Sequence, residues 1–259
     1  MRLIVNPAPA GGPGKNGYAG APTPRGLPRF YEFEIRCIGH ADPTTGYLVD
    51  IKSVDFAVTA SVAPLLARAC AETPEAEPAQ LLPAMAASLR PALPADLLSL
   101  RWRLTPYYSV EVQAARPSTV LIRQKFDFAA SHRLNVSTLS EAENRALFGK
   151  CNNPAGHGHN YQVEPCIAVE LGQAPDHAFT LIDLERLTDE AIIRPFDHKN
   201  LNTDTPEFRE PSGINPSVEN IASVFYHLLN AAIKAQPKKA ELRSLTVWET
   251  DRTSSTYPA

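Results

Sequence analysis

Short runs of alternating apolar and polar residues predict several β-strands along this 259-residue chain, because alternate side chains of a strand point to the same face. The segment FYEFEIRCIG (residues 30–39) places Phe33, Ile35 and Cys37 on one face. LSLRWRLTPYYSVEV (98–112) predicts two strands around a Thr-Pro bend. LRSLTVWETD and RTSSTY predict two more strands near the end of the sequence.

Between these strands the apolar residues recur every three or four positions, which predicts amphipathic helices. From about residue 55 to 97 the chain is rich in alanine and interrupted by prolines, so we expect two or more short helices there. A helix over 183–194 is expected to end at Pro195, before a loop with the sequence FDHKNLN. The next helix is expected to begin near Ser217. Its apolar stripe consists of Ile221, Val224, Phe225, Leu228, Leu229 and Ala232.

The order of the predicted elements is similar in the two halves of the chain, which indicates a tandem repeat. The second half reads strand, strand, helix, helix, strand, strand, and the first half reads strand, turn, helices, strand, strand. Gly39 stands eleven residues before Asp50, and Gly172 stands eleven before Asp183. The expected organisation is an irregular Gly- and Pro-rich arm over 1–29, a first unit over 30–118 and a second unit over 119–259.

Composition and charge exclude several classes of protein. The chain is 44% hydrophobic, as a globular protein is, and its net charge of −3 argues against a general nucleic-acid binder. We expect no membrane-spanning segment and no secretory leader, because no apolar run reaches the length that either needs. The four cysteines are scattered without paired spacing. That pattern favours free thiols in a reducing compartment, so we expect the protein in the cytoplasm.

Three of the seven histidines lie close together in the middle of the chain. FDFAASHRL reads as a strand that ends with His132 facing the same side as two phenylalanines. In HGH, His157 and His159 project to one face of a second strand. Pairing the two strands as a hairpin brings the three imidazoles together. Three histidines with one open position are typical of catalytic zinc, so we expect a Zn²⁺ site here.

Other polar residues could serve the same site. Cys151 would have a lowered pKa beside a dication and could act as a base, although most cysteines are inert core residues. Asp197 and His198 place a carboxylate beside an imidazole, or they form an exposed turn after a helix. Glu249 lies on the apolar face of a strand, where it needs a cationic partner or a ligand that donates hydrogen bonds.

The segments FAASHRL, FGKCNNPAGHGHNY, FDHKNLN, PSVENIA and VWETD occur in this order between residues 126 and 257. Together they resemble the 6-pyruvoyltetrahydropterin synthase family, including the closely related 6-carboxytetrahydropterin synthases of queuosine biosynthesis. The resemblance implies the tunnelling fold (T-fold), an α+β architecture of antiparallel sheets with helices packed on one face. The first half resembles the family only faintly, through GHADPTTGYLVDI, so we expect a degenerate T-fold unit without a metal site.

The resemblance also implies roles for individual residues. His132, His157 and His159 bind zinc, Cys151 abstracts a proton, and Asp197 with His198 completes the proton relay. Glu249 anchors the pterin, helped by Glu219 and by contacts near Ser217. The implied reaction converts 7,8-dihydroneopterin triphosphate to 6-pyruvoyltetrahydropterin with loss of triphosphate.

Two alternatives remain open at this point. One keeps the fold and the metal but forms 6-carboxytetrahydropterin, and the other is a non-catalytic protein that binds zinc or a pterin. In the family, three T-fold units form a barrel and two barrels stack. We therefore expect three tandem chains to assemble into a homo-oligomer of six units.

Overall fold

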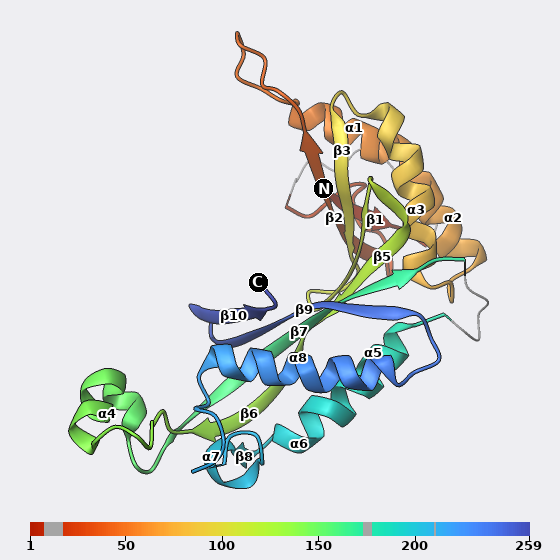
Figure 1. Ribbon diagram of the computed structural model, residues 1–259. Coiled ribbons are helices and arrows are strands. Elements are labelled where there is room, and N and C mark those ends of the chain that lie inside the picture. Colours follow the sequence, from red (N-terminus) through yellow and green to blue (C-terminus); the bar gives the residue numbers. More distant parts are fainter. Residues whose placement is uncertain (8–17, 173–177, 210) are drawn as a thin grey trace. The chain divides into compact units, whose positions relative to one another are not determined.

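The computed structural model describes residues 1–7, 18–172, 178–209 and 211–259, and the chain divides into two compact units (Figure 1). The first unit comprises Met1–Ile122 with Val169–Gln173, and the second comprises Arg123–Ala168 with Ala174–Ala259. The chain therefore passes from one unit to the other near residue 122, close to the boundary expected at 118.

The first unit is built on an antiparallel sheet. Its strands are β1 (Arg2–Val5), β2 (Arg29–Ile38), β3 (Asp96–Arg103), β4 (Tyr108–Gln113) and the first residues of β5 (Arg116–Gln124). They lie in chain order across the sheet. Phe33 stands opposite Trp102, and their rings stack at 5.7 Å. The alternation of apolar residues in β2 and β3 thus produces a buried face, as predicted.

Three short helices connect β2 to β3, as the proline pattern predicted. They are α1 (Ile51–Ser61), α2 (Ala63–Glu72) and α3 (Pro78–Leu89), followed by the 3₁₀ turn η1 (Arg90–Ala92). Prolines stand in the first turns of α2 and α3, where their missing N–H costs no helical hydrogen bond. Leu66, Leu82 and Leu89 are fully buried. The unit therefore has its own apolar core between helices and sheet.

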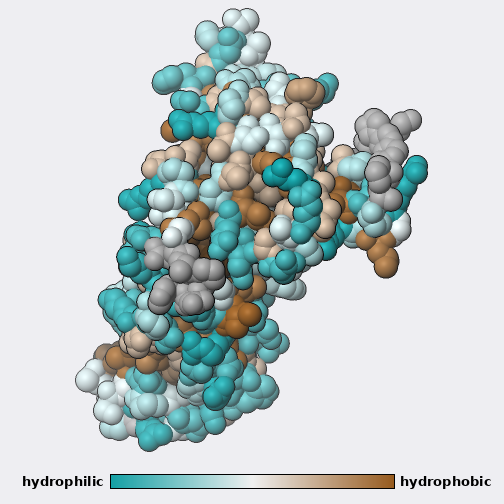
Figure 2. Space-filling model, turned by 90° about the vertical axis from the view of Figure 1, so that its right-hand side faces the viewer, coloured by the Kyte–Doolittle hydropathy of each residue, from teal (hydrophilic) through white to brown (hydrophobic). Residues whose placement is uncertain are grey.

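One stretch of this unit is more apolar than the sequence analysis expected. Over Ile51–Glu72 the mean hydropathy reaches 1.4 in an 18-residue window, of which 22% is buried, so by length and composition alone it could cross a membrane. A core helix of a soluble protein passes the same test. Ile51 and Phe56 are largely exposed on α1, and Figure 2 shows apolar residues among polar ones on the face it presents. The expectation that no apolar run reaches membrane-spanning length is therefore wrong for this segment.

The expected irregular arm over 1–29 is wrong at its beginning. Arg2–Val5 forms β1, and Leu3 and Ile4 are buried against β2. The amino terminus donates a hydrogen bond to the Phe33 carbonyl at 2.9 Å. The stretch is too short for its period to be recognised, and it becomes a strand because β2 offers a free edge. Residues 8–17 of the expected arm lie outside the described residues.

The second unit is also antiparallel, apart from one short strand. Its strands are β6 (Phe126–His132), β7 (His157–Glu170), β8 (Lys199–Asn200), β9 (Ala240–Thr250) and β10 (Thr253–Tyr257). β6 and β9 both pair with β7, β10 pairs antiparallel with β9, and β8 runs parallel to β6. The α+β class with antiparallel sheets and packed helices is confirmed. The duplication of one unit into two stays a prediction.

The helix α8 (Val218–Lys234) packs against β9 and β10 of this unit (Figure 1). It begins where the sequence predicted, because the Ser217 hydroxyl accepts a hydrogen bond from the Asn220 N–H. Phe225 is fully buried, and its ring lies 5.5 Å from that of Phe128 on β6. The helix thus anchors the strand that ends in the first histidine.

Two details differ from the prediction for the region before α8. The helix α5 (Leu181–Thr188) continues through a π-helical turn, η4 (Asp189–Ile193), into α6 (Arg194–Phe196), so Pro195 does not end it. The π turn changes the hydrogen-bond register, and the proline then lies in the first turn of α6, where it is tolerated. The expected loop FDHKNLN contains β8 and the short helix α7 (Leu201–Asp204), which the Asn200 side chain caps.

The polar connection between β6 and β7 also contains unpredicted helices. These are α4 (Glu141–Phe148) and the 3₁₀ turn η2 (Gly149–Asn152). Ser140 and Glu143 form a reciprocal capping box at the start of α4. This signature was present in the sequence. The helix ends at Gly149, whose φ of 54° favours glycine.

Candidate metal centre and active site

The hairpin of β6 and β7 places three histidines on one face, as predicted. His132 stands opposite His157, and Ala130 stands opposite His159, so the three side chains share a face of the sheet. His132 is fully buried, and the other two are partly buried. Gly156 precedes the second strand with φ of 70°, and a Cβ there would lie 3.0 Å from the His132 carbonyl oxygen. A glycine is therefore needed for the approach of the two strands.

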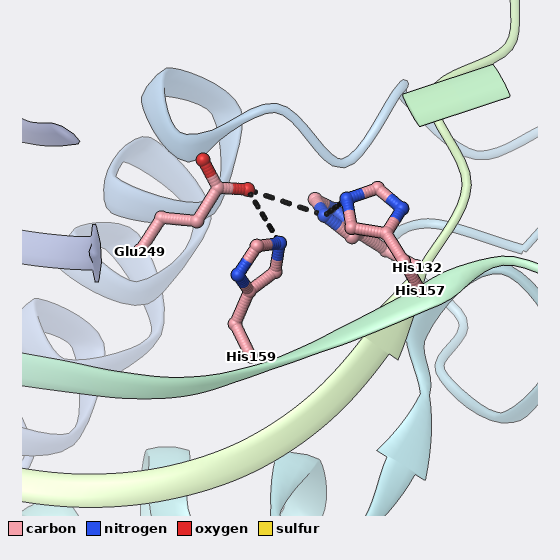
Figure 3. A group of neighbouring side chains, drawn as sticks. All are labelled: His132, His157, His159 and Glu249. Atoms are coloured by element: carbon pink, nitrogen blue, oxygen red, sulfur yellow. Dashed lines mark hydrogen bonds and ion pairs between the residues drawn. The ribbon is translucent and has the colours of Figure 1, made fainter. Parts of the chain in front are cut away.

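The imidazoles converge with one carboxylate at a single point (Figure 3). The Nε2 atoms of His132 and His157 lie 3.1 Å apart. Glu249 on β9 brings its Oε1 to 3.2 Å from His132 Nε2 and 3.3 Å from His159 Nε2. Among the described residues, this is the one group of side chains close enough together to hold a metal ion. On its sequence position alone, Glu249 was predicted to pair with a cation or a ligand and not to join the histidines.

A main-chain carbonyl orients the buried ring of His132. His132 Nδ1 lies 2.7 Å from the carbonyl oxygen of Pro216. A carbonyl can only accept, so Nδ1 carries the proton and the lone pair is on Nε2. This is the orientation that a metal-binding histidine usually has, because the other ring nitrogen donates to the protein.

Three of the distances within the group fit a tetrahedral metal ion, and all four ligand atoms lie within 4.8 Å of one another. Metal–ligand bonds of about 2.0–2.1 Å in a tetrahedron give ligand atoms separated by roughly 3.3 Å. The separations of 3.1, 3.2 and 3.3 Å are close to this value. His159 Nε2 is buried and makes no hydrogen bond, since its 3.3 Å contact with Glu249 is an ion pair only if the ring is protonated. A buried nitrogen without a partner is costly, and a metal ion would satisfy it.

Electrostatics favour the metal-binding protonation states. Burial lowers the pKa of His157, and repulsion from His132 and His159 lowers it further. Burial also lowers the pKa of His159, against the opposing effect of Glu249. Contact with the His132 ring holds the pKa of Glu249 below its usual value, although burial opposes this. The lowered pKa values of His157 and His159 favour neutral rings beside an ionised carboxylate, and these are the forms that bind a cation.

Cys151 lies in η2, half-buried, before the strand that carries the HGH motif. Its carbonyl accepts a hydrogen bond from the Leu134 N–H at 2.9 Å, which ties it to the end of β6. Burial raises the pKa of Tyr161, and Glu249 and then Cys151 raise it further, so the thiol lies within electrostatic reach of Tyr161, whose hydroxyl lies 3.3 Å from His132 Nε2. The structure thus brings Cys151 near the centre that the sequence predicted.

A buried amide and a guanidinium hold the segment of Cys151 in place. Asn152 is 4% exposed, and its side-chain amide donates to the Leu134 carbonyl at 2.8 Å and to Asn135 Oδ1 at 3.0 Å. Arg133 Nε donates to the Asn152 carbonyl at 3.1 Å. Sequence reasoning missed both residues. Their position immediately after His132 and Cys151 was the available signal.

Asp197 and His198 form a hydrogen-bonded pair at the edge of β6. Asp197 accepts from the Ala129 N–H at 2.8 Å, and its other oxygen lies 2.8 Å from His198 Nδ1. The Ala129 N–H and the His198 ring lower the pKa of Asp197. The His198 side chain is 82% exposed, and its φ is 56°. Within the described parts of the chain, no hydrogen bond or ion pair joins Asp197 or His198 to Cys151.

The two remaining predicted residues lie at the beginning of α8. Ser217 caps the helix with its hydroxyl group. Glu219 is exposed in the first turn. Ser217 and Glu219 stand one and three residues after Pro216, whose carbonyl oxygen contacts the His132 ring. Their proposed contacts with a substrate stay predictions.

Comparison with known proteins gives the relationship of the second unit. The family model for "6-pyruvoyl tetrahydropterin synthase" matches residues 121–259. The chain is 38% identical over 136 residues to the human "6-pyruvoyl tetrahydrobiopterin synthase", which covers 52% of this chain and 89% of that protein. The Drosophila melanogaster protein of the same name is 35% identical over 127 residues, or 49% of this chain and 71% of that protein.

A solved structure gives a further comparison. The Caenorhabditis elegans 6-pyruvoyl tetrahydropterin synthase is 31% identical, with a TM-score of 0.48, over 54% of this chain and 94% of that one. Residues 1–120 lie outside the family match. Because the match covers more than half of the chain, this protein belongs to the 6-pyruvoyl tetrahydropterin synthase family.

Proposed function

We propose that this protein is a zinc-dependent lyase that converts 7,8-dihydroneopterin triphosphate to 6-pyruvoyltetrahydropterin with loss of triphosphate. The convergence of three histidine Nε2 atoms within the family-matched unit is the observation that carries the proposal. His132, His157 and His159 would hold the ion. When bound, zinc would polarise the side-chain oxygens of the substrate and acidify the adjacent C–H bonds.

Proton transfer is assigned to Cys151 and to the pair of Asp197 and His198. Cys151 is half-buried beside the centre, where a cation would stabilise its thiolate as a base. Asp197 accepts two hydrogen bonds, which keep it ionised and able to orient the His198 ring. The exposed His198 ring can then deliver a proton to a bound molecule or remove one from it.

Substrate binding is assigned to Glu249, Glu219 and the region of Ser217. A carboxylate can accept paired hydrogen bonds from the amino-pyrimidinone edge of a pterin. Glu249 already lies between two imidazoles, so the same carboxylate would contact both the pterin and the metal ion. Glu219 is exposed in the first turn of α8 and would assist Glu249 at the pterin edge.

We also propose that the chain functions as a homo-oligomer of three copies in a reducing compartment such as the cytoplasm. The four cysteines are free in the structure, which supports a reducing environment. The oligomer would allow Asp197 and His198 of one copy to approach the thiol of another. Light scattering of the purified chain tests the assembly, and a monomer would contradict it.

The decisive experiment is incubation of the zinc-loaded protein with dihydroneopterin triphosphate, followed by mass analysis of the product. A pyruvoyl product is expected. A carboxy product, formed with loss of acetaldehyde, would assign the chain to the 6-carboxytetrahydropterin branch instead. Unchanged substrate would indicate a protein that binds zinc or a pterin without turnover.

A further inference from the structure

We propose that a hollow beside the metal centre, which we call the arginine pocket, binds the triphosphate of the substrate. The arginine pocket has a volume of about 360 Å³. The lining residues that matter for binding are Arg133, Gly156, Asn200, Asn202, Thr203 and Arg209. This inference rests on the proposed substrate, because the histidine group would bind the carbon side chain of that molecule and the arginine pocket would bind its triphosphate.

The arginine pocket is positively charged. Two guanidinium groups line it, and no carboxylate does among the described residues. Arg133 uses Nε and one Nη on Asn152, which leaves its second terminal nitrogen available. Arg209 donates Nε to the Thr203 carbonyl at 2.9 Å, which leaves both of its terminal nitrogens available. Fixed guanidinium groups with spare donors are the usual means of binding phosphate.

Asp204 is an ionised acid close to Arg209. Asp204 accepts from the Asn200 N–H at 2.9 Å and from the Thr203 hydroxyl at 2.9 Å. These bonds hold its pKa low, and Lys199 and Arg209 contribute further. Its negative charge offsets part of the positive charge, but Asp204 does not line the arginine pocket, whereas Arg133 and Arg209 do. The lining itself is therefore positive, as an anion site requires.

The covalent chain places the arginine pocket next to the metal centre. Arg133 directly follows His132, and Gly156 directly precedes His157, so each lies one Cα step of about 3.8 Å from a histidine of the group. Asn200 also lines a second hollow, of 420 Å³, which His159 and His198 line as well. An anion held by the two arginines would thus lie beside His159 and His198, which are proposed to act on the side chain of the substrate.

The test uses the full-length chain, stripped of metal, and inorganic tripolyphosphate as the probe, measured by calorimetry. Removing the metal prevents the probe from binding directly to zinc. Arg209→Gln is the informative variant, because Arg209 is exposed, whereas Arg133 also holds the segment of Cys151. Loss of a charge-assisted contact should raise the Kd about tenfold or more. Arg194→Gln, which removes an exposed arginine paired with Asp189, is the matched control and should leave the Kd unchanged.

An unchanged Kd in Arg209→Gln, or no binding to the parent protein, would overturn the proposal. A second measurement separates its failure from failure of the proposed function. In the zinc-loaded enzyme, Arg209→Gln should raise the KM for dihydroneopterin triphosphate about tenfold, while the affinity for dihydroneopterin, which lacks phosphate, stays the same. If Arg209→Gln turns over the substrate with the KM of the parent enzyme, the arginine pocket is refuted and the proposed lyase function stands. Arg209-dependent binding of tripolyphosphate without turnover would refute the proposed lyase and retain the anion site.

Discussion

Glu249→Gln is the substitution that most directly tests whether this carboxylate is a metal ligand. Its Oε1 lies 3.2 and 3.3 Å from two histidine nitrogens, which are the edge lengths expected around a tetrahedral ion. Glutamine keeps the shape and one oxygen but removes the charge. The fold should therefore be retained while the attraction for a dication falls.

The geometry sets the size of the effect. A ligand oxygen would lie about 2 Å from the ion. Even in a dielectric constant of about 80, a unit charge and a divalent ion at this distance attract by roughly 4 kcal/mol. Desolvation of the carboxylate offsets part of this attraction. We therefore expect a loss of about 2–4 kcal/mol, which corresponds to a roughly 30-fold to 1,000-fold rise in the Kd for zinc.

Competition with a chromophoric zinc chelator measures this Kd, and elemental analysis after dialysis gives the metal content. Glu241→Gln is the control, because Glu241 is exposed on the same strand and pairs with Arg243. It should bind zinc as the parent does. If Glu249→Gln also keeps the parent affinity for zinc and loses only affinity for the pterin, Glu249 is a substrate anchor and the reasoning about the tetrahedron is refuted.

Three further predictions follow from the same geometry. Cys151→Ala should retain one metal ion but lower kcat by about 10²- to 10⁴-fold; loss of metal by elemental analysis would make the cysteine a ligand. Asn152→Ala should lower the free energy of unfolding by about 1–3 kcal/mol in urea titration, because the half-buried Leu134 carbonyl loses its donor. An unchanged midpoint would contradict this. Burial would raise the pKa of Asp183, but the Lys238 ammonium at 2.7 Å and helix-cap hydrogen bonds hold it below the usual value. A carboxyl whose pKa is lowered in the folded state stabilises the protein above its unfolded pKa of about 3.9, and this stability is lost as the pH falls. Asp183→Asn should therefore destabilise the protein at pH 7 and make its free energy of unfolding depend less on pH in the acid range. Parallel curves of unfolding free energy against pH for variant and parent would count against this.

The strands and main helices could be predicted because their patterns are local. Alternation in β2, β3 and β9 and the stripe of α8 each depend on one segment meeting one apolar surface. The errors arose where tertiary contacts decided the outcome. Arg2–Val5 is a strand because an edge of β2 is available to it, and the helix passes Pro195 because a π turn precedes it.

The histidine group shows the same division. Period-two alternation was enough to place His132, His157 and His159 on one face, and the hairpin register confirmed the pairing. Cys151 could be proposed from its place before the HGH motif. The contacts of Arg133 and Asn152, by contrast, cross between segments that the sequence pattern does not connect.

The sequence by itself determined the chemistry of this protein: which side chains are available, which of them share a strand face, and which family the second unit resembles. Only the tertiary structure brought Glu249 on β9 into contact with the imidazoles and set the Pro216 carbonyl against His132. The physical reason is that periodicity encodes which face of an element is buried but not which element lies beside it. Sheet order and helix packing decide that, and they also bring Arg133 and Arg209 to one hollow.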